Sequence, residues 1–203
     1  MTSSVQSPAD AINIALRRIG HKLRIGSLYE GSEAARKAID FYGQTRDALL
    51  RSGDWGFAQR DVALTLLKKA PPGGYMGQPW TSAYPMLPYL FEYTYPSDCI
   101  RVLSIKQTPI FVPNFDPQPN VFSVDNDNSY TPAMKVIVCN VPQAILCYTG
   151  RVTDPSNWEA DFTEALIDDL ARTLAAGFAS EDYVKLEAAV AQSEAQTAEA
   201  EQG

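Results

Sequence analysis

The chain has 203 residues, of which 45% are hydrophobic and 20% charged, a composition typical of a soluble globular protein with its own core. No apolar run approaches the roughly 18 residues of a membrane-spanning helix, so we expect a protein without a membrane partner. Residues 1–6 lack the basic and apolar parts of a signal peptide, so we expect the protein to be made in a cytoplasm. The net charge of −7 argues against sequence-specific binding to DNA, whose phosphates are also negative.

Two helices are predicted at the start of the chain. Ser7 can cap the first, Pro8 fits its first position, Asp10 its third, and Gly20 ends it. Its apolar side chains recur at helical spacing: Ile12, Ala15, Leu16 and Ile19. A second helix is predicted over residues 32–52. The side chains expected to face its core are Ala35, Ala38, Ile39, Tyr42, Leu49 and Leu50.

The middle of the chain is predicted to form short strands. Residues 62–66 alternate like a strand, whereas residues 71–88 are too rich in proline and glycine for a regular element. Four prolines predict a long exposed loop at 107–120, and residues 125–128 are typical of a turn. The other strands are expected near 91–95, 102–105, 121–124, 134–139 and 143–149. For the last three of these strands, a β-hairpin or small meander fits best.

A third, longer helix is predicted to start at Asp154-Pro155-Ser156. Its apolar stripe consists of Trp158, Phe162, Leu166, Leu170 and Leu174, which drifts around the helix by about 40° per step and therefore faces more than one neighbour. Acidic residues Asp161, Glu164 and Asp168 occupy the opposite face, while Asp169 falls near the apolar side. After a last helix from Ser180, residues 190–203 are rich in Ala, Glu and Gln and lack the bulky residues that would anchor them, so we expect a mobile tail.

The order of elements predicts an α+β fold. We expect the terminal helices, residues 1–55 and 150–190, to form a helical bundle lobe. Residues 56–149 are expected to form a small antiparallel β-rich lobe with long proline-rich loops.

Charge is unevenly spread along the chain. Residues 1–69 carry a net charge of +4, residues 70–150 a net −2 and residues 151–203 a net −9. This polarity suits head-to-tail packing of identical copies, although solvated helix faces would give the same pattern. The candidates for a subunit or partner interface are Arg17, Arg18, Arg24, Trp158, Phe162, Asp169, Glu194 and Glu199.

The sequence offers little that indicates catalysis. Cys99, Cys139 and Cys147 form no CxxC pair and are expected to be buried, reduced thiols, and the single histidine, His21, is expected in a solvated loop. Neither Glu92 nor Asp98 has a distinctive setting in the sequence, and no nucleophile or phosphate-loop motif is present. We therefore expect no enzyme activity, no cofactor and no metal.

Aromatic residues between Tyr75 and Tyr95 favour loop packing or a protein contact, with a sugar-binding platform as the alternative.

Three segments together resemble a known family. The first is residues 15–58, which include Ala15-Leu16-Arg17-Arg18-Ile19-Gly20 and Trp55-Gly56-Phe57-Ala58. The second is residues 91–102, which read Phe91-Glu92-Tyr93-Thr94-Tyr95-Pro96-Ser97-Asp98-Cys99-Ile100-Arg101-Val102. The third is residues 147–175, which begin Cys147-Tyr148-Thr149-Gly150-Arg151-Val152-Thr153-Asp154. In their order and spacing they resemble the head-to-tail adaptors of short-tailed bacteriophages, also called tail tubular protein A.

The resemblance implies a structural virion protein, located in the phage tail and made in the host cytoplasm. It implies a homo-oligomeric, dodecameric ring below the portal protein and above the tail nozzle protein, with double-stranded DNA passing through the lumen without specific contacts. Tyr84, Tyr89 and Phe115 are the candidates for tail-side contacts. The alternative is a small virion-associated carboxylate hydrolase or a glycan-binding tail module.

Overall fold

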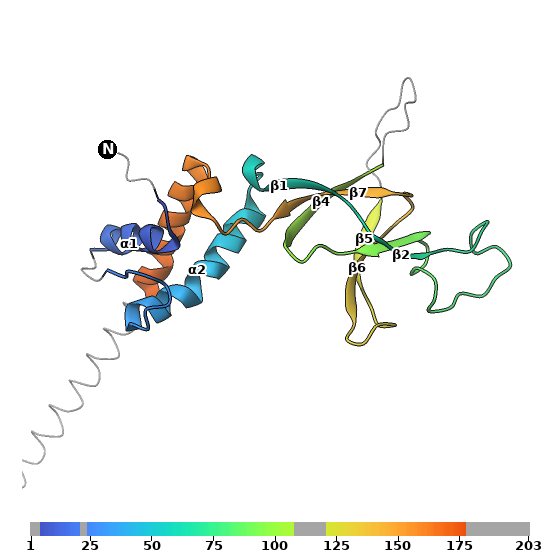
Figure 1. Ribbon diagram of the computed structural model, residues 1–203, viewed down its shortest axis with the longest axis horizontal. Helices are drawn as coiled ribbons and strands as arrows, with labels where there is room; N and C mark the ends of the chain where they lie inside the picture. Colours follow the sequence, from blue (N-terminus) through green and yellow to red (C-terminus); the bar gives the residue numbers. More distant parts are fainter. Residues whose placement is uncertain (1–4, 21–23, 108–120, 178–203) are drawn as a thin grey trace, which may run out of the picture. The chain divides into compact units, whose positions relative to one another are not determined.

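A computed structural model describes residues 5–20, 24–107 and 121–177 (Figure 1). The fold is α+β, which confirms the predicted class: helices come from both ends of the chain and two small antiparallel sheets from its middle. The chain divides into two compact units, one made of Met1–Leu49 and Val152–Gly203, the other of Leu50–Arg151. Several residues singled out above lie outside the described residues: His21, Phe115, Glu194, Glu199 and the tail 190–203.

The first helix of the helical unit, α1 (Pro8–Arg18), has the cap that the sequence predicts. The backbone N–H of Asp10 donates to Ser7 Oγ over 3.2 Å, and the backbone N–H of Ser7 donates to the Asp10 carboxylate over 2.9 Å. These reciprocal bonds satisfy backbone donors that a helix start otherwise leaves without partners. Gly20 follows the helix with φ +76°, a left-handed conformation that glycine adopts at little cost.

The core of the helical unit combines α1 with the helix of residues 160–177, drawn in orange in Figure 1. Its fully buried side chains are Ile12, Leu16, Phe162, Leu166, Leu170 and Leu174. At the surface, Arg18 forms ion pairs with Glu164 and Asp168. Buried Asn13 hydrogen-bonds both backbone groups of Ile25, over 2.8 and 2.9 Å, and so fixes the connection to α2 (Glu33–Ser52) against α1.

In α2, most of the predicted core face is confirmed. Ala35, Ala38, Tyr42 and Leu50 are buried. Ile39, however, is 38% exposed, so its prediction as a core residue was wrong. Helical spacing gives the direction in which a side chain points, but it does not say whether another element covers that turn of the helix.

The β-unit contains two antiparallel sheets. The three-stranded sheet has the order β1 (Gln59–Ala63), β7 (Ala144–Gly150), β4 (Cys99–Gln107). The four-stranded sheet has the order β2 (Leu66–Lys69), β3 (Phe91–Thr94), β6 (Met134–Cys139), β5 (Phe122–Asp127). Their shared core is Tyr93, Ile105, Ile137, Cys139, Val141, Ala144, Leu146 and Tyr148.

Strand β3 of the four-stranded sheet is buried on both faces. Tyr93 points into the shared core, and Glu92, its neighbour in the chain, must point to the opposite face because side chains alternate along a strand. Yet Glu92 is only 2% exposed, and Val136 and Val138 on the adjacent β6 are fully buried. The outer face of this sheet is therefore covered as well.

The structure corrects three boundaries predicted from the sequence. Residues 62–66 are not one strand: β1 ends at Ala63, β2 begins at Leu66, and the two belong to different sheets. Strand β5 continues through Asp127, so the predicted turn at 125–128 begins later. The segment at Asp154 starts a short 3-10 helix, Pro155–Asn157, and the third α-helix begins only at residue 160.

Two further expectations were too simple. Of the last three predicted strands, β5 and β6 do form an antiparallel hairpin, but the third does not extend it into a meander, because β7 pairs with β1 and β4 in the other sheet. Among the cysteines, all of them free thiols, only Cys139 is buried, whereas Cys99 and Cys147 are half-buried on strands β4 and β7. Strand alternation within a small two-sheet unit leaves such positions partly open.

Candidate functional site

The connection between β2 and β3 is held in place by its own aromatic side chains. Tyr75 Oη lies 3.0 Å from the carbonyl oxygen of Pro85 and 3.1 Å from that of Tyr89. The indole N–H of Trp80 donates to the same Pro85 carbonyl over 2.8 Å. The Tyr75 hydroxyl and the Trp80 indole N–H thus both have hydrogen-bond partners, and these bonds order the connection although it contains no helix or strand. This agrees with the prediction that residues 71–88 contain no regular element.

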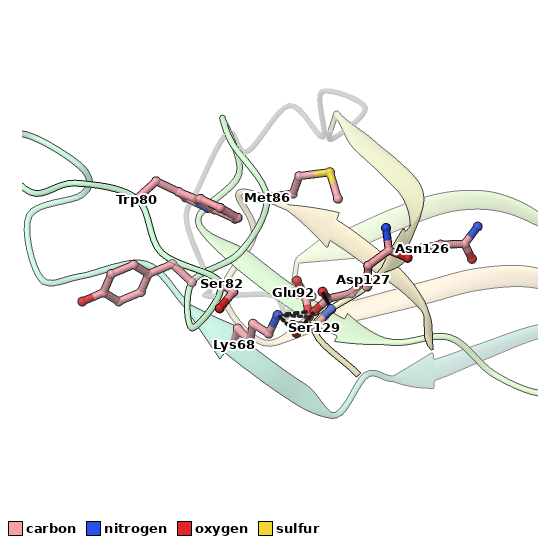
Figure 2. Close-up of a pocket in the computed structure, with 10 residues that line it drawn as sticks. Lys68, Trp80, Ser82, Met86, Glu92, Asn126, Asp127 and Ser129 are labelled. Atoms are coloured by element: carbon pink, nitrogen blue, oxygen red, sulfur yellow. Dashed lines mark hydrogen bonds and ion pairs between the residues drawn. The ribbon is translucent and has the colours of Figure 1, made fainter. Parts of the chain in front are cut away.

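Between this connection and the four-stranded sheet lies a pocket of about 520 Å³ (Figure 2). Figure 2 shows Trp80 and Met86 on the side of the connection, and Lys68, Glu92, Asp127 and Ser129 converging opposite them. The lining residues are Lys68, Trp80, Ser82, Tyr84, Met86, Glu92, Asn126, Asp127, Asn128 and Ser129. Its size is in the range of sites that bind small molecules, about 300–1,000 Å³.

Three charged side chains meet in this pocket from three different strands. Lys68 of β2 and Glu92 of β3 are direct cross-strand neighbours, with Lys68 Nζ 3.5 Å from Glu92 Oε1. Lys68 also forms an ion pair with Asp127, which lies on β5 at the far edge of the sheet. In a flat sheet about 14 Å would separate these edges, so the contact requires a curled sheet.

Ser129 completes the arrangement around Asp127. Its backbone N–H donates to Asp127 Oδ1 over 2.8 Å, its hydroxyl lies 3.0 Å from Asp127 Oδ2, and Lys68 Nζ donates to the same hydroxyl over 2.9 Å. The Glu92 carboxylate accepts fewer hydrogen bonds than that of Asp127: its Oε1 is buried and has no hydrogen-bond partner in the structure. Such an orphaned acceptor is unusual in a protein interior.

These environments shift the pKa values of the two carboxyl groups in opposite directions. Burial, together with a hydrogen bond to Asp127, raises the pKa of Glu92 to about 7 despite the nearby Lys68. For Asp127, burial acts to raise the pKa, but hydrogen bonds from Lys68 and Ser129 outweigh it and lower the pKa to about 2. Near neutral pH, Asp127 is therefore ionised and Glu92 is partly protonated.

The chemistry open to this pair is limited by its geometry. Glycoside hydrolysis needs two carboxyl groups about 5–9 Å apart, with space for the sugar or a water between them. Here the Lys68 ammonium contacts both Glu92 and Asp127, so it takes the place that a sugar or a water would need between them. The arrangement suits holding a ligand better than cleaving one.

Asp98, the other carboxylate of the β-unit considered in the sequence, has a structural setting. It forms an ion pair with Arg60 of β1 and accepts a hydrogen bond from Tyr148 Oη of β7 over 3.1 Å. Its backbone carbonyl accepts from the N–H of Arg151 over 2.8 Å. These contacts join β1, β7 and the start of β4 and leave Asp98 outside the pocket.

The structure distributes the predicted interface residues over different environments. Arg17 and Arg24 are exposed, and the described part of the chain offers neither of them a carboxylate partner. Arg18 is engaged by Glu164 and Asp168 of its own chain. Asp169 pairs with Arg172.

The predicted aromatic interface residues are less exposed. Phe162 is fully buried in its own unit, and Trp158 is half-buried beside it, with ring centroids 5.4 Å apart. Tyr84 lies on the pocket wall, and Tyr89 is half-buried next to the connection's hydrogen bonds. The pocket itself was missed from the sequence, although its aromatic wall lies in the segment considered there as a sugar platform.

Other features of a functional site are absent from the residues the structure describes. They contain no group of three His, Cys, Asp or Glu side chains placed to hold a metal ion. None of the described helices is both long and apolar enough to cross a membrane. No family model matches the chain, and neither does any curated protein. The resemblance to head-to-tail adaptors therefore stays a prediction.

Proposed function

We propose that the chain is a structural virion protein: a head-to-tail adaptor of a short-tailed bacteriophage that forms a dodecameric ring. In this proposal the ring joins the portal protein to the tail nozzle protein and surrounds the path of the double-stranded DNA. The protein acts without a cofactor and without catalysis.

The observation that carries the proposal is the exposure of two arginines, Arg17 and Arg24, on the helical unit. Arg17 and Arg24 are exposed and have no carboxylate partner among the described residues, while the same unit carries the acidic helix of residues 160–177. Complementary charges at two places on one subunit suit a ring, in which each copy presents one surface to the next.

A second observation supports a partner on the β-unit. Met76 is 92% exposed and Leu87 53% exposed, and both lie on the connection between β2 and β3 without lining the pocket. Large apolar side chains exposed on the same connection favour a protein contact there. We assign this contact to the tail nozzle, on the same side as Tyr84 and Tyr89.

The test is assembly of the purified chain, observed by mass photometry and negative-stain electron microscopy, alone and with the portal. The parent chain is expected to form closed rings. The double variant Arg17→Glu/Arg24→Glu is expected to remain monomeric with an unchanged melting temperature, because the described residues offer neither side chain a carboxylate partner to lose.

The matched control is Arg36→Glu/Lys69→Glu, which changes the charge by the same amount at exposed positions that likewise have no carboxylate partner among the described residues. It is expected to assemble like the parent. A parent chain that stays monomeric with and without portal, or an Arg17→Glu/Arg24→Glu variant that still forms rings, would contradict the proposed assembly.

A further inference from the structure

We infer that the pocket between the β2–β3 connection and the four-stranded sheet binds a neutral sugar unit of a glycan. The inference goes beyond the proposed adaptor function and does not depend on it. It concerns binding only, since the Lys68 ammonium contacts both carboxyl groups and takes the place that hydrolysis would need for the sugar or a water.

The first support is the orphaned oxygen of Glu92. This side chain is 98% buried, lines the pocket, and keeps Oε1 without a hydrogen-bond partner. Its neighbour Lys68 is 3.5 Å away but is directed to Asp127 and Ser129. An unsatisfied buried acceptor destabilises the protein, and a ligand hydroxyl that donates to Oε1 would remove this destabilisation.

The second support is the charge of the pocket. Lys68 and Asp127 neutralise one another, so a cationic ligand would meet Lys68 and an anionic ligand would meet Asp127 and Glu92. A neutral ligand meets no such repulsion. Moreover, the rim is formed by Ser82, Asn126, Asn128 and Ser129, whose hydroxyls and amides both donate and accept hydrogen bonds. Sugar hydroxyls need partners of both kinds.

The third support is the aromatic wall. Trp80 is 48% exposed, and its indole N–H is already bound to Pro85, so the ring is held in one orientation with an open surface. Tyr84 packs edge-on against Tyr75 at 6.2 Å and lines the same pocket. An apolar face fixed in advance beside polar groups suits a sugar ring, which has an apolar face and a polar edge.

The test is a titration of the full chain with three neutral trisaccharides, maltotriose, cellotriose and triacetylchitotriose, followed by two-dimensional NMR. The indole signal of Trp80 is assigned with Trp80→Phe. At least one sugar is expected to shift this signal with saturation and a Kd of about 1 mM or tighter. Trp80→Ala is expected to weaken binding at least about tenfold, whereas Met76→Ala, which is on the same connection but outside the pocket, is not.

Glu92 is tested with a pair of variants. Glu92→Gln keeps an acceptor oxygen and is expected to bind like the parent, while Glu92→Leu removes it and is expected to lose binding. If Glu92→Leu does not fold, the Trp80 and Met76 variants decide. The inference is overturned if no trisaccharide saturates, if Trp80→Ala binds as tightly as the parent, or if N-acetylarginine amide binds in the pocket and the sugars do not. Ring assembly of Trp80→Ala is expected to be normal, so failure of sugar binding and failure of assembly are separate results.

Discussion

Glu92 and Asp127 share one pocket, yet protonation of the two carboxyl groups affects folding in opposite ways. The pKa of Glu92 is raised from 4.5 to about 7, so the native state binds a proton that the unfolded state has already released between these values. Stability therefore falls as pH rises through this range. The pKa of Asp127 is lowered from 3.8 to about 2, so its contribution is present above pH 3.8 and is lost as pH falls toward 2.

Glu92→Gln is expected to remove the first of these effects. The amide imitates the protonated carboxyl but cannot ionise, so the variant should exceed the parent in stability by up to about 3 kcal/mol at about pH 8.5 and match it at about pH 4. Urea denaturation at both pH values measures this difference. Glu159→Gln, an exposed position, is the control. Equal pH dependence in Glu92→Gln and parent would show that Glu92 does not titrate in this range.

The importance of Glu92 could not be predicted from the alternation of residues 91–95. Alternation predicts one buried and one solvated face, and it places Glu92 on the solvated face with Thr94. In the structure, the β2–β3 connection folds back over this region and Lys68 reaches Glu92 from the neighbouring strand. Both contacts join residues distant in sequence, so the pattern of residues within one strand cannot predict them.

At the scale of single elements, the cap of α1 was predicted correctly, whereas the assignment of residues 62–66 to a single strand was wrong. The cap of α1 was predicted because Ser7 and Asp10 contact only each other and their own backbone. The break between β1 and β2 was missed because both halves of residues 62–66 alternate correctly, and only their partners, β7 and β3, reveal that they belong to different sheets.

The late start of the third helix changes what is expected of its aromatic residues. Phe162 is fully buried inside the helix, so Phe162→Ala should destabilise the unit by about 3–5 kcal/mol. Trp158 lies before the helix, is half-buried, and has one hydrogen bond of 3.3 Å to the carbonyl of Val152. Trp158→Ala should therefore destabilise by only about 1–2 kcal/mol. Urea denaturation of both variants gives the order, and a larger effect at Trp158 would contradict its placement.

At the scale of the whole molecule, charge is the property that sequence and structure connect most directly. The basic start and acidic end of the chain both contribute to the helical unit, where Arg18 already joins them within one subunit. In the proposed ring, we expect Arg17 and Arg24 to form ion pairs with acidic residues of the neighbouring subunit. The class of fold could be predicted because it follows from the order of elements; which surfaces meet could not, because that depends on exposure and on partners.

Assembly through exposed charges should weaken as salt is added. The screening length falls from about 10 Å at 0.1 M to about 3 Å at 1 M ionic strength. Rings of the parent chain are therefore expected to dissociate as sodium chloride rises over this range, while the melting temperature of the monomer changes little. Mass photometry across a salt series measures the ring fraction. Rings that persist or grow with salt would indicate that apolar contacts hold them instead.

The helical unit is discontinuous, with the whole β-unit between its two parts, and this imposes an order on folding during synthesis. The β-unit, Leu50–Arg151, is complete before the ribosome reaches the helix of residues 160–177. Until that helix emerges, the core around α1 lacks the buried side chains of Phe162, Leu166, Leu170 and Leu174, and Arg18 lacks the carboxylates of Glu164 and Asp168. In the nascent chain the β-unit can therefore fold first, whereas the helical unit can complete its core only when the helix of residues 160–177 has been translated. In the proposed ring, we therefore expect an interface through α1 to form only after the helix of residues 160–177 has been translated.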